Sequence, residues 1–161
     1  MINEKDLQIL NIIQNNSKLS NAEIAKQVDM APSGVFGRIK RLEEQGIITN
    51  YEARLNAERL NLGLVAYLRV KTDGREDSFS QLVALPEVQE VHYITGEDGY
   101  LVKVRVSGHE ALRNLVRKRI SSIKSVQSTK TSVVLETLKE TSKLPILFGT
   151  RNGKKGKGPR S

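Results

Sequence analysis

The chain has 161 residues, of which 38% are hydrophobic, so it is long enough for one medium domain or two small ones with compact cores. It contains no cysteine, which excludes disulfides, thiolate metal sites and cysteine nucleophiles. The formal net charge is +8, but residues 1–61 hold 8 basic and 8 acidic residues, and residues 62–150 hold 13 and 10. The last eleven residues, RNGKKGKGPRS, hold five bases and no acid, so most of the basicity belongs to a tail and does not by itself indicate a nucleic-acid interface.

The first residues, MINEKDLQIL, are acidic where a signal peptide would be basic and then apolar. No apolar run is long enough to cross a bilayer. We therefore expect a cytoplasmic protein without a membrane partner.

Three short helices are predicted in the first 46 residues. The first follows Asn3 and runs to about Asn15, because apolar residues recur there at helical spacing. The second begins at Ser20, where SNAE is a capping box, and the third begins with Pro32 and ends at Gly46. This arrangement predicts an N-terminal helix-turn-helix domain.

The domain boundaries follow from changes in periodicity. We expect the helix-turn-helix domain over residues 1–50, a linker strand over 51–61, a second domain over 62–142, and a C-terminal segment with a basic disordered tail over 143–161. In that last segment, KLPILFG could pack as a final edge segment.

The second domain is predicted to have the order βαββαβ. The strands and helices are expected, in chain order, over residues 62–72, 75–85, 88–95, 100–107, 109–123 and 126–139, with Phe79, Leu82 and Val83 facing inward from the first helix. This is the order of an α+β ferredoxin-like sandwich, in which helices cover one face of an antiparallel sheet. Self-association is the simplest way to cover the other face.

The helix-turn-helix itself is expected at about residues 21–40, with a short turn before Pro32. On a helical wheel of about 3.6 residues per turn, Val35, Ile39 and Leu42 point inward. Small and basic residues lie opposite them or beside them, and these are the candidate DNA-binding residues: Ser33, Gly34, Gly37, Arg38, Lys40 and Arg41. Each glycine costs about 1 kcal/mol of helix stability relative to alanine, which favours a need for close approach to a groove wall.

Two other interpretations of this helix stay open. It can be an ordinary solvated helix face, although a capped preceding helix, a short turn and an acid-free basic stretch together favour a DNA reader. GVFG can also be the backbone-clamping loop of a KH-type RNA binder, but Val35 continues a helical period with Ile39 and Leu42, and no strand lies close enough to build that fold.

Over nearly its whole length, up to about Ile146, the chain resembles the Lrp/AsnC, or feast/famine, family. The match is carried by EKDLQIL, LSNAEIAKQVDMAPSGVFGRIKRLEEQGIITNYEARLN, LPEVQEVHYITGEDGYLVKVRV and TKTSVVLETLK. The resemblance implies a transcriptional regulator of double-stranded DNA with an N-terminal winged helix-turn-helix. It also implies a sandwich that forms homodimers, with further assembly into tetramers or octamers. One departure is Ala31, where many members carry a serine that caps the recognition helix.

The resemblance also implies an effector site, for a small molecule such as an amino acid, near the loop between the second and third sandwich strands. The matching positions are Gly96, Glu97, Asp98, Tyr100, Thr129 and Thr131. The family pattern is Gly-Asp-x-Asp followed by an aromatic residue, and Gly99 stands here at the second acidic position, where a carboxylate would pair with an ammonium group. TGEDGY is equally consistent with a plain hairpin whose glycines adopt positive φ.

No enzymatic chemistry is expected. His92 and His109 are the only histidines, neither belongs to a cluster at metal-ligand spacing, and Lys103 and Arg105 are expected on a solvated strand face. We expect no metal and no cofactor. Two alternatives remain: a sirohaem-decarboxylase-like enzyme, which resembles the family in both halves, and a protein that coats DNA with little specificity.

Overall fold

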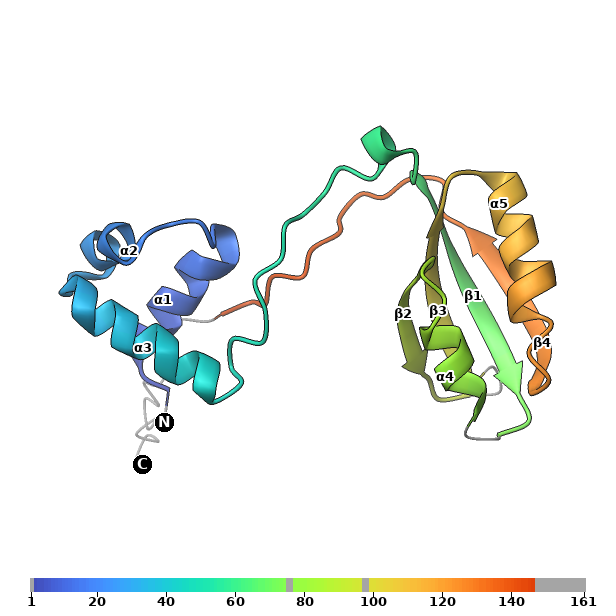
Figure 1. The fold of residues 1–161 in the computed structure, drawn as a ribbon, viewed down its shortest axis with the longest axis horizontal. Helices are drawn as coiled ribbons and strands as arrows, with labels where there is room; N and C mark the ends of the chain where they lie inside the picture. Colours follow the sequence, from blue (N-terminus) through green and yellow to red (C-terminus); the bar gives the residue numbers. More distant parts are fainter. Residues whose placement is uncertain (1, 75–76, 97–98, 147–161) are drawn as a thin grey trace, which may run out of the picture. The chain divides into compact units, whose positions relative to one another are not determined.

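The computed structural model describes residues 2–74, 77–96 and 99–146 of the chain, which is drawn in Figure 1. The chain forms two compact units, one of Met1–Ala53 together with Glu140–Ser161 and the other of Arg54–Lys139. The tail that was predicted to be disordered lies outside the described residues, as do Glu97 and Asp98.

The first unit contains the three predicted helices, α1 (Glu4–Asn15), α2 (Asn21–Val28) and α3 (Pro32–Glu44). A capping box begins α1 and another begins α2, where the Ser20 hydroxyl accepts from the Glu23 backbone N–H and the Glu23 carboxylate accepts from the Ser20 N–H. Helix α3 begins with Pro32, and Gly46 follows its end at φ +65°, as predicted. The turn between α2 and α3 starts at Asp29, which adopts a left-handed conformation.

The three helices share one apolar core. Its buried members come from all three helices and are Ile9, Ile13, Ile24, Ala25, Val28 and Val35. Each valine or isoleucine among them stabilises the fold by about 1.5–3 kcal/mol relative to an exposed one. This core positions α3 against α1 and α2, and leaves one side of α3 facing solvent.

The C-terminal segment belongs to the helical unit and is bound to the end of α1. The side-chain amide of Gln14 donates to the Leu144 carbonyl and accepts from the Leu144 N–H, both at 3.0 Å. Lys143 Nζ donates to Asn15 Oδ1 at 2.6 Å. Of the expected edge segment, residues 143–146 are described, and they form no strand. The amide of Gln14 offers the donor and acceptor of a peptide group, and so it pairs with the chain in place of a neighbouring strand.

The predicted linker strand over 51–61 is also absent. These residues form no strand, and a short 3₁₀ helix, η1 (Glu58–Leu60), lies within them. A strand requires a partner for its backbone groups, and no strand of the described residues pairs with this segment. The linker strand was thus a wrong prediction for the single chain.

The second unit has the predicted βαββαβ order. Its elements are β1 (Leu64–Thr72), α4 (Asp77–Val83), β2 (Val88–Tyr93), β3 (Tyr100–Val106), α5 (His109–Asn114) continued by the π-helical turn η2 (Leu115–Ile120), and β4 (Val126–Val133). The four strands pair antiparallel in the order β2-β3-β1-β4. Figure 1 shows α4 and α5 beside this sheet.

Both helices cover the same face of the sheet. Ala66, Leu68 and Val70 of β1 are fully buried and pack with Leu82 of α4 and Leu112 of α5. On β3, Val102, Val104 and Val106 pair with residues of β1 and belong to the same core, so every second residue of this strand faces the helices. The fold class is therefore α+β, as the sequence predicted.

Helix α4 buries less than predicted. Leu82 is buried, but Phe79 and Val83 are 46% and 59% exposed, so the inward placement of these two residues was wrong. The helix has seven residues, about two turns, and only one row of side chains faces the sheet. None of the helices in the described ranges is long and apolar enough to span a bilayer.

Candidate nucleic-acid interface

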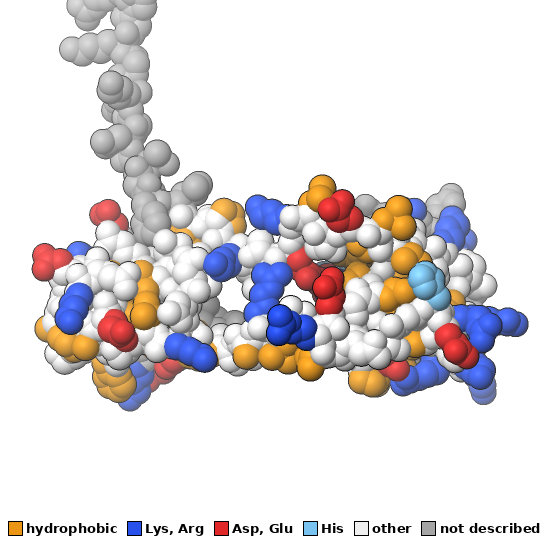
Figure 2. Space-filling view, turned by 90° about the horizontal axis from the view of Figure 1, so that it is seen from above, with side chains coloured by type: hydrophobic (Ala, Val, Ile, Leu, Met, Phe, Trp, Pro, Cys, Tyr) orange, Lys and Arg blue, Asp and Glu red, His pale blue; other side chains and the backbone are white. Residues whose placement is uncertain are grey.

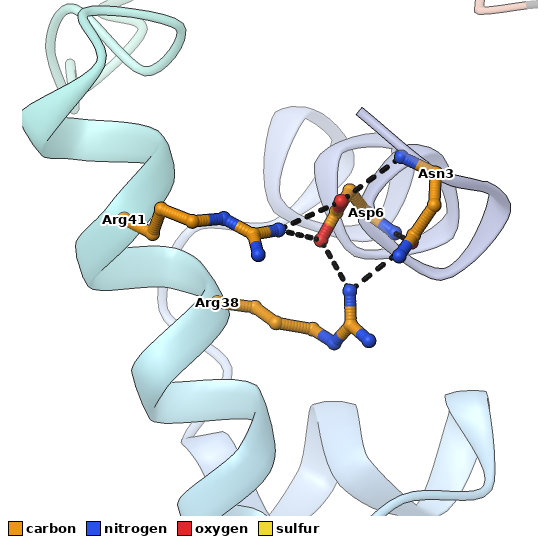
Figure 3. A network of polar contacts seen from close by, with 4 residues as sticks. All are labelled: Asn3, Asp6, Arg38 and Arg41. Carbon is orange, nitrogen blue, oxygen red and sulfur yellow. Dashed lines mark hydrogen bonds and ion pairs between the residues drawn. The ribbon is translucent and has the colours of Figure 1, made fainter. Parts of the chain in front are cut away.

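A buried carboxylate joins α1 to α3. Asp6 has no exposed surface, and its oxygens accept from Arg38 Nη1 at 2.7 Å and from Arg41 Nη2 at 2.8 Å (Figure 3). The carboxylate also accepts from the Asn3 backbone N–H at 3.0 Å, and Asn3 Oδ1 accepts from Arg38 at 3.1 Å. Every lone-pair direction of the Asp6 carboxylate thus has a partner supplied by the chain.

The surroundings of Asp6 keep it ionised. Burial alone would raise the pKa of Asp6, but the Asn3 hydrogen bond and the guanidinium groups of Arg38 and Arg41 outweigh burial and hold that pKa below its ordinary value. A charged carboxylate with two arginines is a strong, charge-assisted link. It fixes the rotation of α3 about its own axis, because both arginines come from one side of that helix.

This network changes how two of the predicted DNA-binding residues can act. The Arg38 and Arg41 side chains are 25% and 44% exposed, so part of each remains at the surface. A DNA phosphate that bound either guanidinium would share it with Asp6. Their pairing with Asp6, more than thirty residues away, has no local signal in the sequence.

A second side of α3 faces solvent. Ser33, Gly37 and Lys40 are exposed there, and the Lys40 side chain is 63% exposed with one long contact of 3.9 Å to Glu44. An isolated surface pair of this length contributes little, so Lys40 is available to an anion. Together with Phe36 these residues form what we call the outer face of α3: Ser33, Phe36, Gly37 and Lys40.

Phe36 is the residue of this face that sequence reasoning missed. Its side chain is 56% exposed, although it lies one residue from the buried Val35. The signal was present in the helical wheel, because a residue following Val35 is rotated by about 100° and falls outside the arc of Val35, Ile39 and Leu42. Phe36 was left out of the candidates because only small and basic residues were considered as DNA contacts.

The two glycines of α3 differ in what an added Cβ atom would contact. A Cβ on Gly34 would lie 3.3 Å from Met30 Cε, the end of a flexible side chain, so a larger residue there would require Met30 to shift. A Cβ on Gly37 would meet no atom of the chain within 4 Å. The cost of Gly37 to the helix, about 1 kcal/mol, is not explained by the protein's own packing.

On the face shown in Figure 2, basic, acidic and hydrophobic side chains are interspersed in both units, so charge on that face does not mark an interface. The segment from Ser33 to Leu42 differs in its sequence, since it holds three basic residues and no acid. The candidate interface is therefore defined by helix geometry and local composition.

The backbone at Gly96 and Gly99, in the candidate effector loop, accounts for the departure of this loop from the family pattern. Gly96 and Gly99 have φ of +109° and +73°, so both adopt backbone conformations that favour glycine. A Cβ on Gly99 would also lie 3.1 Å from the Val70 carbonyl oxygen. An aspartate at position 99 would be strained in this backbone. Glu97 and Asp98, the remaining acidic candidates, are outside the described residues.

The other effector candidates lie on strands that flank β1. Tyr100 of β3 and Thr129 of β4 both pair with Val70, and Thr131 pairs with Leu68 one step along. Residues directly opposite each other in an antiparallel sheet point to the same face, which here is the face of the buried Val70 and Leu68. The Tyr100 ring contacts that of Tyr93, with centroids 5.4 Å apart.

On the opposite face of the sheet, Lys103 is not solvated as predicted. It is 7% exposed, and its Nζ donates to Glu90 Oε1 at 3.0 Å. The hydrogen bond from Lys103 is the main cause that lowers the pKa of Glu90, and His92, 3.3 Å from Glu90, adds to it. Lys103 can be buried because β2 places an acid, Glu90, directly across from it.

Comparison with known proteins agrees with this geometry. Residues 2–49 match the model of a winged helix-turn-helix DNA-binding domain, and residues 65–144 match that of the Lrp/AsnC ligand binding domain. The chain is 38% identical over 146 residues to the leucine-responsive regulatory protein of Haemophilus influenzae, covering 88% of each chain, and 35% identical to that of Escherichia coli, covering 88% and 89%.

Solved structures show the same architecture. A transcriptional regulator of Neisseria meningitidis in complex with L-methionine is 33% identical, with a TM-score of 0.85 over 90% of this chain and 97% of that one. Escherichia coli AsnC is 26% identical, with a TM-score of 0.82 over 88% and 97%. From its two domains, their order and these relatives, the chain belongs to the Lrp/AsnC family of DNA-binding transcriptional regulators.

Proposed function

We propose that this regulator recognises specific DNA sites through the outer face of α3, with Ser33 and Lys40 making polar contacts and Gly37 allowing the helix to approach the groove wall. The observation that carries the proposal is the solvent-open side of α3, a helix that holds no acid from Ser33 to Leu42 and whose rotation is fixed by Asp6. A lysine binds phosphate or the acceptor edge of guanine, and a serine hydroxyl bonds either.

Arg41 and Arg38 have a supporting role in this proposal. Their guanidinium groups bond Asp6, so they orient the helix and add positive charge at its edge. Arg41, the more exposed of the two, contacts phosphate from that position, whereas Gly34 serves the packing of Met30. In this proposal the six candidate residues separate into three that face the groove, Ser33, Gly37 and Lys40, and three that support them, Gly34, Arg38 and Arg41.

We further propose a homodimer that presents two copies of α3 to successive major grooves, and a small effector, such as an amino acid, that binds near the 96–100 hairpin. The relative from Neisseria meningitidis, which was solved with L-methionine, supports an amino acid effector. Because Gly99 carries no carboxylate, the partner for an effector ammonium group would be Glu97 or Asp98.

Replacing Lys40 with alanine tests the DNA assignment. Binding to a site selected from random duplexes should weaken, and the dependence of log affinity on log salt should fall by about 0.9, the value for one phosphate contact. Lys118→Ala is the matched control, because it removes the same charge from an exposed lysine of η2 in the sandwich unit.

Equal affinity of Lys40→Ala and wild type, at matched oligomer mass, would contradict the assignment. Equal affinity of wild type for selected and unrelated duplexes would favour a protein that coats DNA with little specificity.

A further inference from the structure

We infer that Phe36 is a specificity-determining residue that packs against the C5-methyl group of a thymine in the major groove. The inference rests on the proposed function, since it assigns a base contact to the outer face of α3. It concerns an apolar residue that the polar and basic candidates do not include.

The exposure of Phe36 is the first observation. Of the described large hydrophobic side chains in α1, α2 and α3, it is the one classed as exposed, at 56%. Burying such a ring is favourable by roughly 25 cal/mol for each Å² of apolar surface removed from water. Contact with an apolar partner would therefore remove the Phe36 ring from water and contribute favourably to the free energy of binding.

The neighbours of Phe36 identify that partner. Pro32 and Ile39 lie one turn from the ring on the side toward the core, whereas Ser33 and Lys40 lie one turn from it on the outer face. The hydroxyl and ammonium groups on that outer face suit a polar groove better than the apolar core of a protein interface. In the major groove, the thymine methyl is the apolar group that lies among phosphates and base acceptors.

Gly37 supplies the second, independent observation. A Cβ at Gly37 would meet nothing of the chain within 4 Å, so the backbone beside Phe36 is uncovered. A helix without a side chain at that point can lie deeper in the groove, which brings the Cα and Cβ atoms of Phe36 closer to the base edges. The Asp6 network fixes the rotation of α3 and so fixes the direction in which Phe36 points.

The test uses deoxyuridine, which differs from thymidine only by lacking the C5-methyl group. A site selected by wild-type protein from random duplexes is resynthesised with single thymidines replaced by deoxyuridine. Wild type should bind about threefold to fivefold more weakly when one thymidine in a half-site is replaced, as expected for the loss of one buried methyl-sized group. Phe36→Ala should bind both duplexes equally, while Phe36→Leu should keep part of the discrimination.

Lys40→Ala is the matched control. It should weaken binding to both duplexes by the same factor and leave the thymidine-to-deoxyuridine ratio unchanged. Discrimination that persists in Phe36→Ala, or that is absent in wild type, would overturn the inference while leaving specific DNA binding intact. A drop in oligomer mass of Phe36→Ala without DNA would also overturn it, by showing that a second copy covers the ring. If no sequence is enriched from the random pool, the proposed function itself fails.

Discussion

The helical unit and the sandwich hold their candidate sites in different ways. In the helical unit, one buried carboxylate and two arginines fix α3, and the candidate DNA contacts follow one another along that single helix. In the sandwich, the candidates lie at a hairpin that requires Gly96 and Gly99 and on two strands separated by β1. A DNA surface can therefore be identified within one unit, whereas a ligand that touched both Tyr100 and Thr129 would have to span β1.

Replacing Asp6 should have the largest effect, because the link between α1 and α3 depends on its charge. Asp6→Asn keeps the shape but weakens the bonds to Arg38 and Arg41, and we expect a loss of about 2–3 kcal/mol in the free energy of unfolding. Urea denaturation measures this loss. Glu44→Gln is the control, since it removes an exposed acid whose contact with Lys40 is 3.9 Å, and it should change stability by less than about 0.5 kcal/mol. Equal effects of the two variants would contradict a special role for Asp6.

The same link should depend on pH. The pKa of Asp6 is lower in the folded chain than its ordinary value of 3.8, so its contribution is complete above that value and is lost as the pH falls through the folded pKa. The stability difference between wild type and Asp6→Asn should therefore shrink below about pH 3.8. Urea denaturation at a series of pH values measures it. A difference that stays constant down to pH 2 would show that shape, and not charge, holds α3.

The tolerance of the hairpin to substitution should depend on its backbone conformation, whereas the placement of α3 depends on the charge of Asp6. Gly99→Ala adds a Cβ at φ +73° that lies 3.1 Å from the Val70 oxygen, and we expect a loss of about 2 kcal/mol. Gly74→Ala is the matched control, because Gly74 has φ +83° but an added Cβ would meet nothing within 4 Å. It should cost about 1 kcal/mol, the expense of positive φ alone. If the two variants unfold at the same urea concentration, the Val70 contact is not what excludes a side chain at position 99.

Breaking the Glu90–Lys103 ion pair of the sheet should lower the free energy of unfolding less than breaking the pairs of Asp6 with Arg38 and Arg41. Glu90→Gln removes the charge opposite the buried Lys103, but the Glu90 side chain is 44% exposed and water screens the pair. We expect a loss of about 1 kcal/mol in thermal or urea denaturation. Glu110→Gln, which breaks an exposed pair with Arg113, is the control and should have no measurable effect. A loss as large as that of Asp6→Asn would remove the distinction between the two units.

Local signals in the sequence predicted most of the fold. The SNAE capping box, Pro32 and Gly46 give the helix ends, because each acts on the backbone within one turn. The alternation of Val102, Val104 and Val106 gives the buried face of β3. These features depend on neighbours in the chain, so they can be found without knowing the tertiary structure.

The remaining features depend on partners distant in the chain. Asp6 meets Arg41 across 35 residues, and Gln14 meets Leu144 across 130, and neither pairing leaves a periodic pattern. Phe79 was predicted inward because helical spacing shows which residues share a face, but not how much of that face a short helix can bury. The candidate site on α3 therefore stays a prediction from local sequence, while the partners of its arginines required the structure.

The smallest expected effect is a gain in the free energy of unfolding from a new cap at the start of α3. Helices α1 and α2 begin with capping boxes, but Ala31 precedes α3 and makes no side-chain cap, although its φ of −72° and ψ of 144° suit one. In Ala31→Ser, the new hydroxyl would accept from the Gly34 or Ser33 backbone N–H, and we expect a gain of about 0.5–1 kcal/mol in urea denaturation. Ala53→Ser, at an exposed position that begins no helix, should give no gain. Since the cap acts on the first turn and Asp6 acts on the middle of α3, the gain should add to the loss from Asp6→Asn in the double variant. A gain that disappears in that variant would show that the first turn of α3 is ordered by the Asp6 network, and that the helix begins where α1 holds it.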